Sequence, residues 1–378
     1  MNREPAPFRL SIPEAALEDL RGRLARTRLP DEPPLEPWAS GTSRAYMEGL
    51  IAYWSSGFDW RAQENGLNRF RQFTVPLGGI ELHFIHEPGK GPNPIPLLLS
   101  HGWPGSIIEF RRLIPLLTER FTVVAPSLPG YTLSFRPGQK RFAVEDIAEL
   151  FAELMTDVLG YRRFAAQGGD WGAFVSSVLG WRHPEKLIGI HLNLLAISRD
   201  PKRRDPKIPP ENEDEASYLA QLAHWLKEET GYQWIQGTKP QTLAYALADS
   251  PAGLAAWIAE KFWKWSDCNG AIENAVSRDD LLANIALYWF TGAIGASFWP
   301  YYARMHGPWP IPEGKTVDVP TGYAEFPKEI LRPPRSLAAR TYTDIRRWTV
   351  MPRGGHFAAL EQPELLAREI HEFFSALR

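Results

Sequence analysis

A carboxylate stands at the centre of a glycine-rich turn, Gly168-Gly169-Asp170-Trp171-Gly172. The turn follows a short apolar segment and precedes a helical pattern. Small residues around the central position are typical of the tight strand-to-helix turn that exposes a nucleophile. Asp170 is therefore a candidate nucleophile, and because a carboxylate is ionised at neutral pH it needs no base to activate it. The alternative is that Asp170 caps the helix, since aspartate is a favoured N-cap residue.

A second segment, Ser-His-Gly-Trp-Pro-Gly-Ser at residues 100–106, directly follows an apolar run. A loop at this place can aim a backbone N–H at the turn that carries Asp170. The N–H groups of Trp103 and Trp171 would then form an oxyanion hole, which stabilises negative charge that develops in a reaction. The alternative is an ordinary Trp-Pro-Gly turn without a catalytic role.

A histidine, His356, follows a Gly-Gly turn near the C-terminus, in the segment MPRGGHFAALEQPE. The chain order nucleophile, acid, histidine is the one found where such a nucleophile turn lies on a parallel sheet. Three carboxylates precede His356 at suitable distances along the chain: Asp318, Glu325 and Glu329. We expect Asp318 to lie inside a strand, which makes it the poorer candidate, and the spacing alone leaves Glu325 and Glu329 open.

The elements around these residues alternate between strands and helices. Apolar runs predict strands at 95–100, 121–126, 163–168 and 188–195, and amphipathic patterns predict helices near 107–118, 144–160 and 172–181. This alternation predicts an α/β fold with a mostly parallel sheet covered by helices on both faces. Residues 198–315 are helical in pattern and rich in aromatic residues, and the alternation resumes with 316–323 and 346–352 and ends in a C-terminal helix. Upstream, we expect helices at 12–27 and 43–55 and a strand pair within 70–88.

Composition narrows the functional classes. The formal net charge of −2 does not indicate a nucleic-acid partner. The single cysteine, Cys268, excludes an internal disulfide framework and a multi-cysteine metal site. The N-terminal 30 residues contain neither an apolar signal core nor a span of about 20 apolar residues, so we expect a soluble, cytoplasmic protein without a membrane anchor.

Six segments together carry a family resemblance: HGWPGS, GGDWG, ETGYQWIQGTKP, DSPAGLAAWIAEKF, VPTGYAEFPKEI and RGGHFAALEQPE. The chain resembles the microsomal-type epoxide hydrolases over nearly its whole length. These enzymes are α/β-hydrolases with an N-terminal extension. The resemblance implies an extension at 1–90, an α/β-hydrolase core at 91–197 and 316–378, and a helical lid at 198–315.

The resemblance also implies roles for individual residues. The family's nucleophile corresponds to Asp170, its histidine to His356 and its acid to Glu329. Its two lid tyrosines correspond to Tyr232 and Tyr301, with the neighbouring Tyr302 as the alternative for the second. The implied reaction converts a hydrophobic epoxide and water into a vicinal diol through an alkyl ester on the nucleophile, and it requires neither a metal nor an organic cofactor.

Two other readings compete with this one. A haloalkane dehalogenase also uses an aspartate nucleophile and a histidine, but a departing halide needs no proton, so paired tyrosines would be idle. A non-catalytic ligand-binding α/β-hydrolase would be expected to lack a member of the triad. The sequence leaves open which epoxide is hydrolysed, the regio- and enantioselectivity, and the oligomeric state, including a homodimer.

Overall fold

A computed structural model describes residues 4–197 and 210–377. Its centre is a nine-stranded sheet with the strand order β1-β2-β3-β5-β4-β6-β7-β8-β9. The six neighbouring strands β5, β4, β6, β7, β8 and β9 pair in parallel, whereas β1, β2 and β3 extend the sheet antiparallel at one edge. The predicted α/β architecture with a mostly parallel sheet is therefore confirmed.

The central strands are apolar along their whole length because helices cover both faces of the sheet. All six residues of β5 are buried, as are five of the six residues of β4. The strands are β1 (Ala6–Phe8), β2 (Gln72–Leu77), β3 (Ile80–Glu87), β4 (Ile95–Ser100), β5 (Phe121–Pro126), β6 (Phe164–Gly168), β7 (Leu187–Leu192), β8 (Thr321–Glu325) and β9 (Ile345–Val350).

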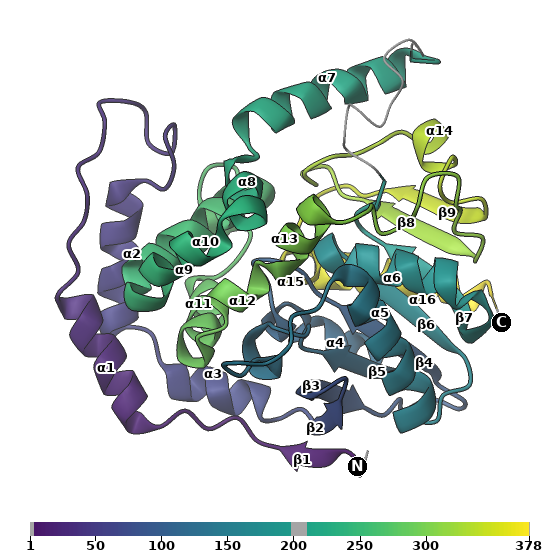
Figure 1. Cartoon of the computed structure of the whole chain (residues 1–378), viewed down its shortest axis with the longest axis horizontal. Helices are drawn as coiled ribbons and strands as arrows, with labels where there is room; N and C mark the ends of the chain where they lie inside the picture. The colour runs from purple at the N-terminus through teal and green to yellow at the C-terminus, as the bar shows by residue number, and fades with distance from the viewer. Residues whose placement is uncertain (1–3, 198–209, 378) are drawn as a thin grey trace.

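Two pairs of helices cover the sheet, with α5 packed on α6 and α4 packed on α16 (Figure 1). In α5 the apolar residues recur at helical spacing, so that one stripe is buried. The predicted helix 144–160 ends as regular α-helix at Glu153 and continues as a π-helical turn. These helices are α4 (Leu113–Leu117), α5 (Val144–Glu153), α6 (Asp170–Arg182), α15 (Ala358–Glu361) and α16 (Pro363–Ser375).

The chain between β7 and β8 forms a helical insertion, as the sequence predicts for its described part. It stands beside the sheet as a separate group of helices (Figure 1). Residues 198–209 of the predicted insertion lie outside the described residues. The helices are α7 (Glu213–Glu228), α8 (Gly231–Thr238), α9 (Pro240–Asp249), α10 (Pro251–Trp265), α11 (Arg278–Thr291), α12 (Ile294–Ser297) and α13 (Trp299–His306).

The N-terminal segment contributes α1 (Glu14–Ala25), α2 (Arg44–Ser56) and α3 (Trp60–Leu67), besides the edge strands β1 to β3. These helices contact the insertion directly. The hydroxyl of Tyr53 on α2 donates to Asp279 Oδ1 on α11 at 2.8 Å. Arg111 links the two regions, because it donates to Gln63 Oε1 of α3 at 2.6 Å and forms an ion pair with Asp280 of α11.

One predicted element is wrong in its position. The segment that contains Asp318 is not a strand, because β8 begins only at Thr321 and Val317 makes a single bridge to Tyr342. Pro320 lacks an N–H for a strand ladder, which explains why regular pairing starts after it. Asp318 is exposed and accepts a hydrogen bond from the Thr343 hydroxyl at 2.6 Å.

Within the described chain, no single helix has the length and apolar composition needed to cross a membrane. One bent pair of segments, Arg278–Thr291 and Ile294–His306 with an angle of 105° between them, meets those criteria only when taken together.

Candidate active site

Asp170 is the first residue of α6 and directly follows the tight turn after β6. The N-cap of α6 is Gly169, so the alternative that Asp170 caps the helix is wrong. Asp170 has a φ of 44°, a left-handed conformation that costs energy in a non-glycine residue and is typical of functional sites. A Cβ added at Gly172 would lie 1.9 Å from the Ser100 carbonyl oxygen, so only glycine permits this close packing.

The loop after β4 approaches the carboxylate closely. The backbone N–H of Trp103 donates to Asp170 Oδ1 at 2.8 Å. A Cβ at Gly102 would lie 2.2 Å from the same oxygen, so a side chain there would collide with the carboxylate. Trp171 is the second residue of α6, and N–H groups in the first turn of a helix have no acceptor within that helix. Both predicted oxyanion-hole residues therefore lie beside Asp170.

Helix α11 of the insertion holds this loop in place. Asn284 Nδ2 donates to the Pro104 carbonyl oxygen at 2.7 Å, and the Tyr288 hydroxyl donates to the Gly105 carbonyl oxygen at 2.7 Å. Both side chains are buried. Sequence reasoning did not identify these two residues, because the segments that meet here are about 180 residues apart in the chain.

His356 connects Asp170 to a buried carboxylate. Its Nδ1 lies 2.7 Å from Glu329 Oε1, and its Nε2 lies 3.5 Å from Asp170 Oδ2. A parallel bridge between Lys328 and Gly355 places the residues that follow each of them side by side. His356 therefore lies between Asp170 and Glu329, which is the arrangement that the predicted nucleophile, histidine and acid require.

Glu325, the alternative acid, lies elsewhere. It is the last residue of β8, and its Oε2 accepts a hydrogen bond from Trp348 Nε1 at 3.0 Å. The Glu329 side chain is fully buried against His356, with a relative exposure of 0 %. The geometry thus brings Glu329, and not Glu325, to the histidine.

The two carboxylates govern the charge of the histidine. Burial lowers the pKa of His356, but Glu329 and Asp170 outweigh it and raise the pKa to about 10. The imidazole is accordingly cationic at neutral pH as long as Asp170 carries its negative charge.

Two tyrosines of the insertion face the carboxylate. Tyr232 on α8 and Tyr301 on α13 are each 4 % exposed, and their ring centroids are 5.7 Å apart. Both line one cavity with Asp170. Tyr302 points elsewhere, since its ring stacks on Trp299 with a centroid distance of 4.9 Å. The structure therefore brings Tyr301, and not Tyr302, to Asp170.

The phenols differ in their surroundings. Gln233 Nε2 donates to Tyr232 Oη at 2.9 Å, so the phenol oxygen is the acceptor in this hydrogen bond. Burial, together with Tyr232 and Asp170, raises the pKa of the Tyr301 phenol well above its usual value. Tyr301 is therefore protonated at neutral pH.

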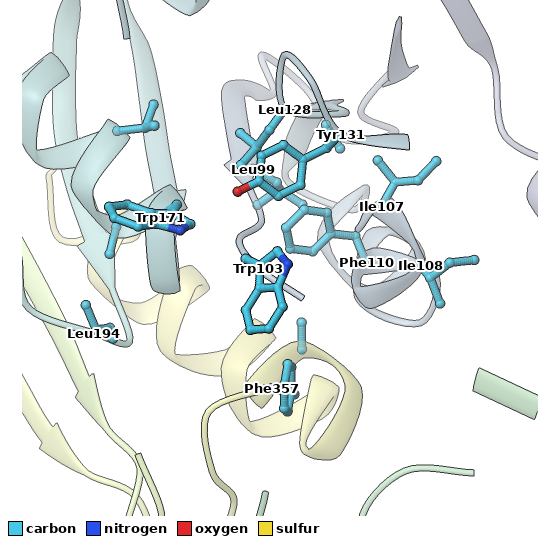
Figure 2. Packing of buried hydrophobic residues seen from close by; sticks show 14 of the residues in the cluster. Leu99, Trp103, Ile107, Ile108, Phe110, Leu128, Tyr131, Trp171, Leu194 and Phe357 are labelled. Carbon is cyan, nitrogen blue, oxygen red and sulfur yellow. The ribbon is translucent and has the colours of Figure 1, made fainter. Parts of the chain in front are cut away.

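Aromatic side chains pack around the site. Trp103 stacks on Tyr232 with a centroid distance of 5.5 Å, and Trp171 meets Tyr301 edge to face at 4.8 Å. Figure 2 shows Trp103 and Trp171 among the buried apolar side chains, with Phe357 below them and Tyr131 above. This packing surrounds Asp170 with aromatic side chains.

A small cavity lies on the other side of the carboxylate. Its volume is about 20 Å³, and Asp170, His356, Glu109 and Asn193 are among the residues that line it. Burial raises the pKa of Glu109 to about 8, so this carboxyl group is neutral at pH 7. Sequence reasoning did not identify Glu109. An acidic residue within the apolar segment Ile-Ile-Glu-Phe could have indicated a buried carboxyl group.

Metal binding finds no support in the described part of the chain. Among residues 4–197 and 210–377, no three His, Cys, Asp or Glu side chains are grouped so as to hold a metal ion.

Comparisons with known proteins agree with this geometry. Residues 5–110 match the family model described as epoxide hydrolase N terminus, and residues 95–243 match the model of the alpha/beta hydrolase fold. Over 405 residues the chain is 38 % identical to epoxide hydrolase 1 of Oryctolagus cuniculus, an alignment that covers 97 % of this chain and 88 % of that protein. The chain belongs to the epoxide hydrolase family.

Solved epoxide hydrolase structures have the same fold. The Aspergillus niger epoxide hydrolase superposes with a TM-score of 0.86 and 31 % identity, covering 99 % of this chain and 97 % of that one. The juvenile hormone epoxide hydrolase of Bombyx mori superposes with a TM-score of 0.88 and 31 % identity, covering 100 % and 95 %. The predicted α/β-hydrolase fold and the predicted family of this epoxide hydrolase are thus confirmed.

Proposed function

We propose that this epoxide hydrolase converts hydrophobic epoxides into vicinal diols through a covalent alkyl ester on Asp170. The observation that carries the proposal is the asymmetric setting of the Asp170 carboxylate. Oδ1 accepts the Trp103 N–H, whereas Oδ2 faces His356 at 3.5 Å. Two buried phenols, Tyr232 and Tyr301, share a cavity with this carboxylate.

In the first step Asp170 Oδ2 attacks an epoxide carbon and the C–O bond of the ring breaks. The leaving oxygen becomes an alkoxide, so it requires a proton as the bond breaks. A phenol is protonated at pH 7 and can supply that proton. Tyr232 and Tyr301 are the proposed donors, and the apolar walls of Trp171 and Phe174 in the same cavity favour a hydrophobic substrate.

In the second step His356 takes a proton from water, and the resulting hydroxide attacks the Cγ of the ester. Alkylation removes the negative charge of Asp170, which is one of the charges that raise the pKa of His356. The imidazole therefore loses its proton more readily in the ester than in the free enzyme. This proton restores the phenol that protonated the leaving oxygen, and the neutral imidazole can then act as the base. The cavity of about 20 Å³ beside His356 is large enough for one water molecule.

The remaining groups hold these atoms in place. Glu329 accepts from His356 Nδ1, which directs Nε2 toward the water and stabilises the imidazolium. Oδ1 becomes the carbonyl oxygen of the ester and stays beside the Trp103 N–H. The tetrahedral oxyanion would form on this oxygen, where the N–H groups of Trp103 and Trp171 can stabilise it. Cleavage of the bond between Cγ and Oδ2 releases the diol, whose alkoxide oxygen takes up the proton from His356. The carboxylic acid left on Asp170 then gives its proton to His356, which restores the free enzyme.

The wider organisation of the protein is proposed on the sequence alone. It comprises an N-terminal extension at 1–90, a core at 91–197 and 316–378, and a lid at 198–315. The cytoplasmic location and the homodimer also stay predictions.

The test is intact-mass spectrometry of His356→Gln after exposure to a panel of epoxides and bromoalkanes. This variant should form the ester without releasing it, so the protein should gain the mass of one whole epoxide, mapped to Asp170. The double variant Asp170→Asn with His356→Gln is the control and should gain nothing.

Two other outcomes contradict the proposal. Adducts from bromoalkanes alone, lighter by the lost halide, would indicate a dehalogenase. No adduct from any compound, with the ligand retained non-covalently, would indicate a binding protein.

A further inference from the structure

Lys261 is a buried lysine in α10 that the proposed reaction does not use. Its side chain is 7 % exposed, and it forms an ion pair with the neighbouring Glu260, whose side chain is 23 % exposed. Lysine is almost never buried to this extent without a partner. Because the carboxylate is the more exposed member, the positive end of the pair is the one turned into the protein.

The ammonium lies against the faces of two aromatic rings. Lys261 Nζ is 4.5 Å from the centroid of the Tyr232 ring and 5.5 Å from that of Trp265. Trp265 lies one helical turn after Lys261 and also contacts His356, whose ring centroid is 5.1 Å from that of the indole. The positive charge is therefore placed at the ring of one proposed proton donor.

The second phenol has a different electrostatic environment. Among residues 4–197 and 210–377 no cation lies over the Tyr301 ring, and the nearby Arg304 has its guanidinium over Trp309 at 5.2 Å. The negative charge of Asp170 raises the pKa of Tyr301, because it disfavours formation of a phenolate. The positive charge of Lys261 has the opposite effect on formation of a phenolate at Tyr232. The two tyrosines are therefore unequal as acids.

We propose that Lys261 is a positioning residue that makes Tyr232 the principal proton donor to the epoxide oxygen. When the O–H bond of Tyr232 breaks and its proton moves to the leaving oxygen, negative charge spreads from the phenolate oxygen over the ring. An ammonium at the face of that ring stabilises this charge more strongly than it stabilises the neutral phenol. The inference rests on the proposed function, because it requires a phenol that donates during alkylation.

Other charged or titratable groups lie near the same phenol and must be the same in the variants that are compared. They are Glu260 on α10, Tyr301 and Arg304 on α13, and Asp170 and His356 on the core.

The test measures the rate of ester formation in the His356→Gln background by intact mass over time. Lys261→Met retains the apolar stem and removes the charge, and it should slow alkylation about tenfold. Lys261→Arg retains a cation and should restore most of the rate. Lys264→Met is the matched control, since Lys264 lies on the same helix but pairs with Glu229 at 2.8 Å and is 41 % exposed; it should leave the rate unchanged.

A second readout separates charge stabilisation from packing. The loss of alkylation at high pH, which reports deprotonation of the donor phenol, should move to higher pH in Lys261→Met. The tenfold effect should persist with Tyr301→Phe and disappear with Tyr232→Phe.

An unchanged alkylation rate in Lys261→Met, with normal adduct formation in His356→Gln, would overturn this inference alone. An equal loss in Lys261→Met and Lys261→Arg without a shift in the pH profile would also overturn it, because it would indicate a packing role. No adduct in His356→Gln itself would instead overturn the proposed function.

Discussion

On the core side of the active site, Asp170, His356 and Glu329 stand beyond the ends of three sheet strands, β6, β9 and β8. On the lid side, Tyr232 and Tyr301 lie on helices of the insertion and are held by stacked and edge-to-face aromatic rings. The core thus presents carboxylates and an imidazole that follow sheet strands, and the insertion presents two phenols that are held by side-chain packing.

This difference corresponds to the two halves of the proposed reaction. Attack and ester hydrolysis need charges at defined positions, which a rigid sheet edge provides. Protonation of the leaving oxygen needs groups that remain neutral until the bond breaks, and a buried aromatic environment keeps phenols neutral. Substitutions on the two sides should therefore affect different steps.

The largest effect is expected on the core side, at the nucleophile. Asp170→Asn should abolish turnover, a loss of roughly 10⁴-fold or more, because no ester can form. Diol formation measured by chromatography tests this, and an unchanged melting temperature shows that the fold is intact. Substantial diol formation by this variant would mean that water attacks the epoxide directly.

On the lid side, the double variant Tyr232→Phe with Tyr301→Phe should slow alkylation by about 10²- to 10⁴-fold, because both proton donors are lost. Single-turnover kinetics can follow this step, aided by the fluorescence of Trp103 and Trp171 near the site. An active double variant would refute the proposal that Tyr232 and Tyr301 protonate the leaving oxygen.

The third prediction separates the two chemical steps on the core side. Glu329→Gln should slow hydrolysis of the ester by about 10²-fold or more while affecting its formation less, since Glu329 orients and charges the base. The ester should then accumulate in intact-mass spectra during turnover. Glu325→Gln is the matched control, and accumulation there instead would transfer the role of the acid to Glu325.

The smallest effect concerns stability and pH. The pKa of His356 is about 10 in the folded protein and lies near 6.5 in the unfolded chain, so its contribution to stability is complete below pH 6.5 and is lost as the pH rises toward 10. The loss is at most about 1.4 kcal/mol per pH unit.

Denaturant titrations between pH 8 and 10 can measure this loss against His356→Gln; the comparison is needed because Glu109, whose pKa is about 8, also titrates at the lower end of this window. The wild type should lose more stability across it than His356→Gln. Equal slopes would show that the folded protein does not hold a proton on His356.

Local patterns of the sequence determined much of the fold. The strands β4 and β5 have the predicted bounds, 95–100 and 121–126, because apolar runs between turn residues specify buried strands without help from distant residues. The positions of Asp170 and His356 at the sheet edge follow in the same way, since glycine-rich turns after strands mark that edge.

Only the tertiary structure decided which other residues contact Asp170 and His356. Glu325 and Glu329 are four positions apart, and the parallel bridge between Lys328 and Gly355 places one of them beside His356. Distant segments also determine the hydrogen bonds of Asn284 and Tyr288 to the loop after β4 and the position of the Lys261 ammonium at the Tyr232 ring. Side-chain contacts of this kind are set by packing between elements, and sequence periodicity specifies the elements but not the pairs of residues that meet.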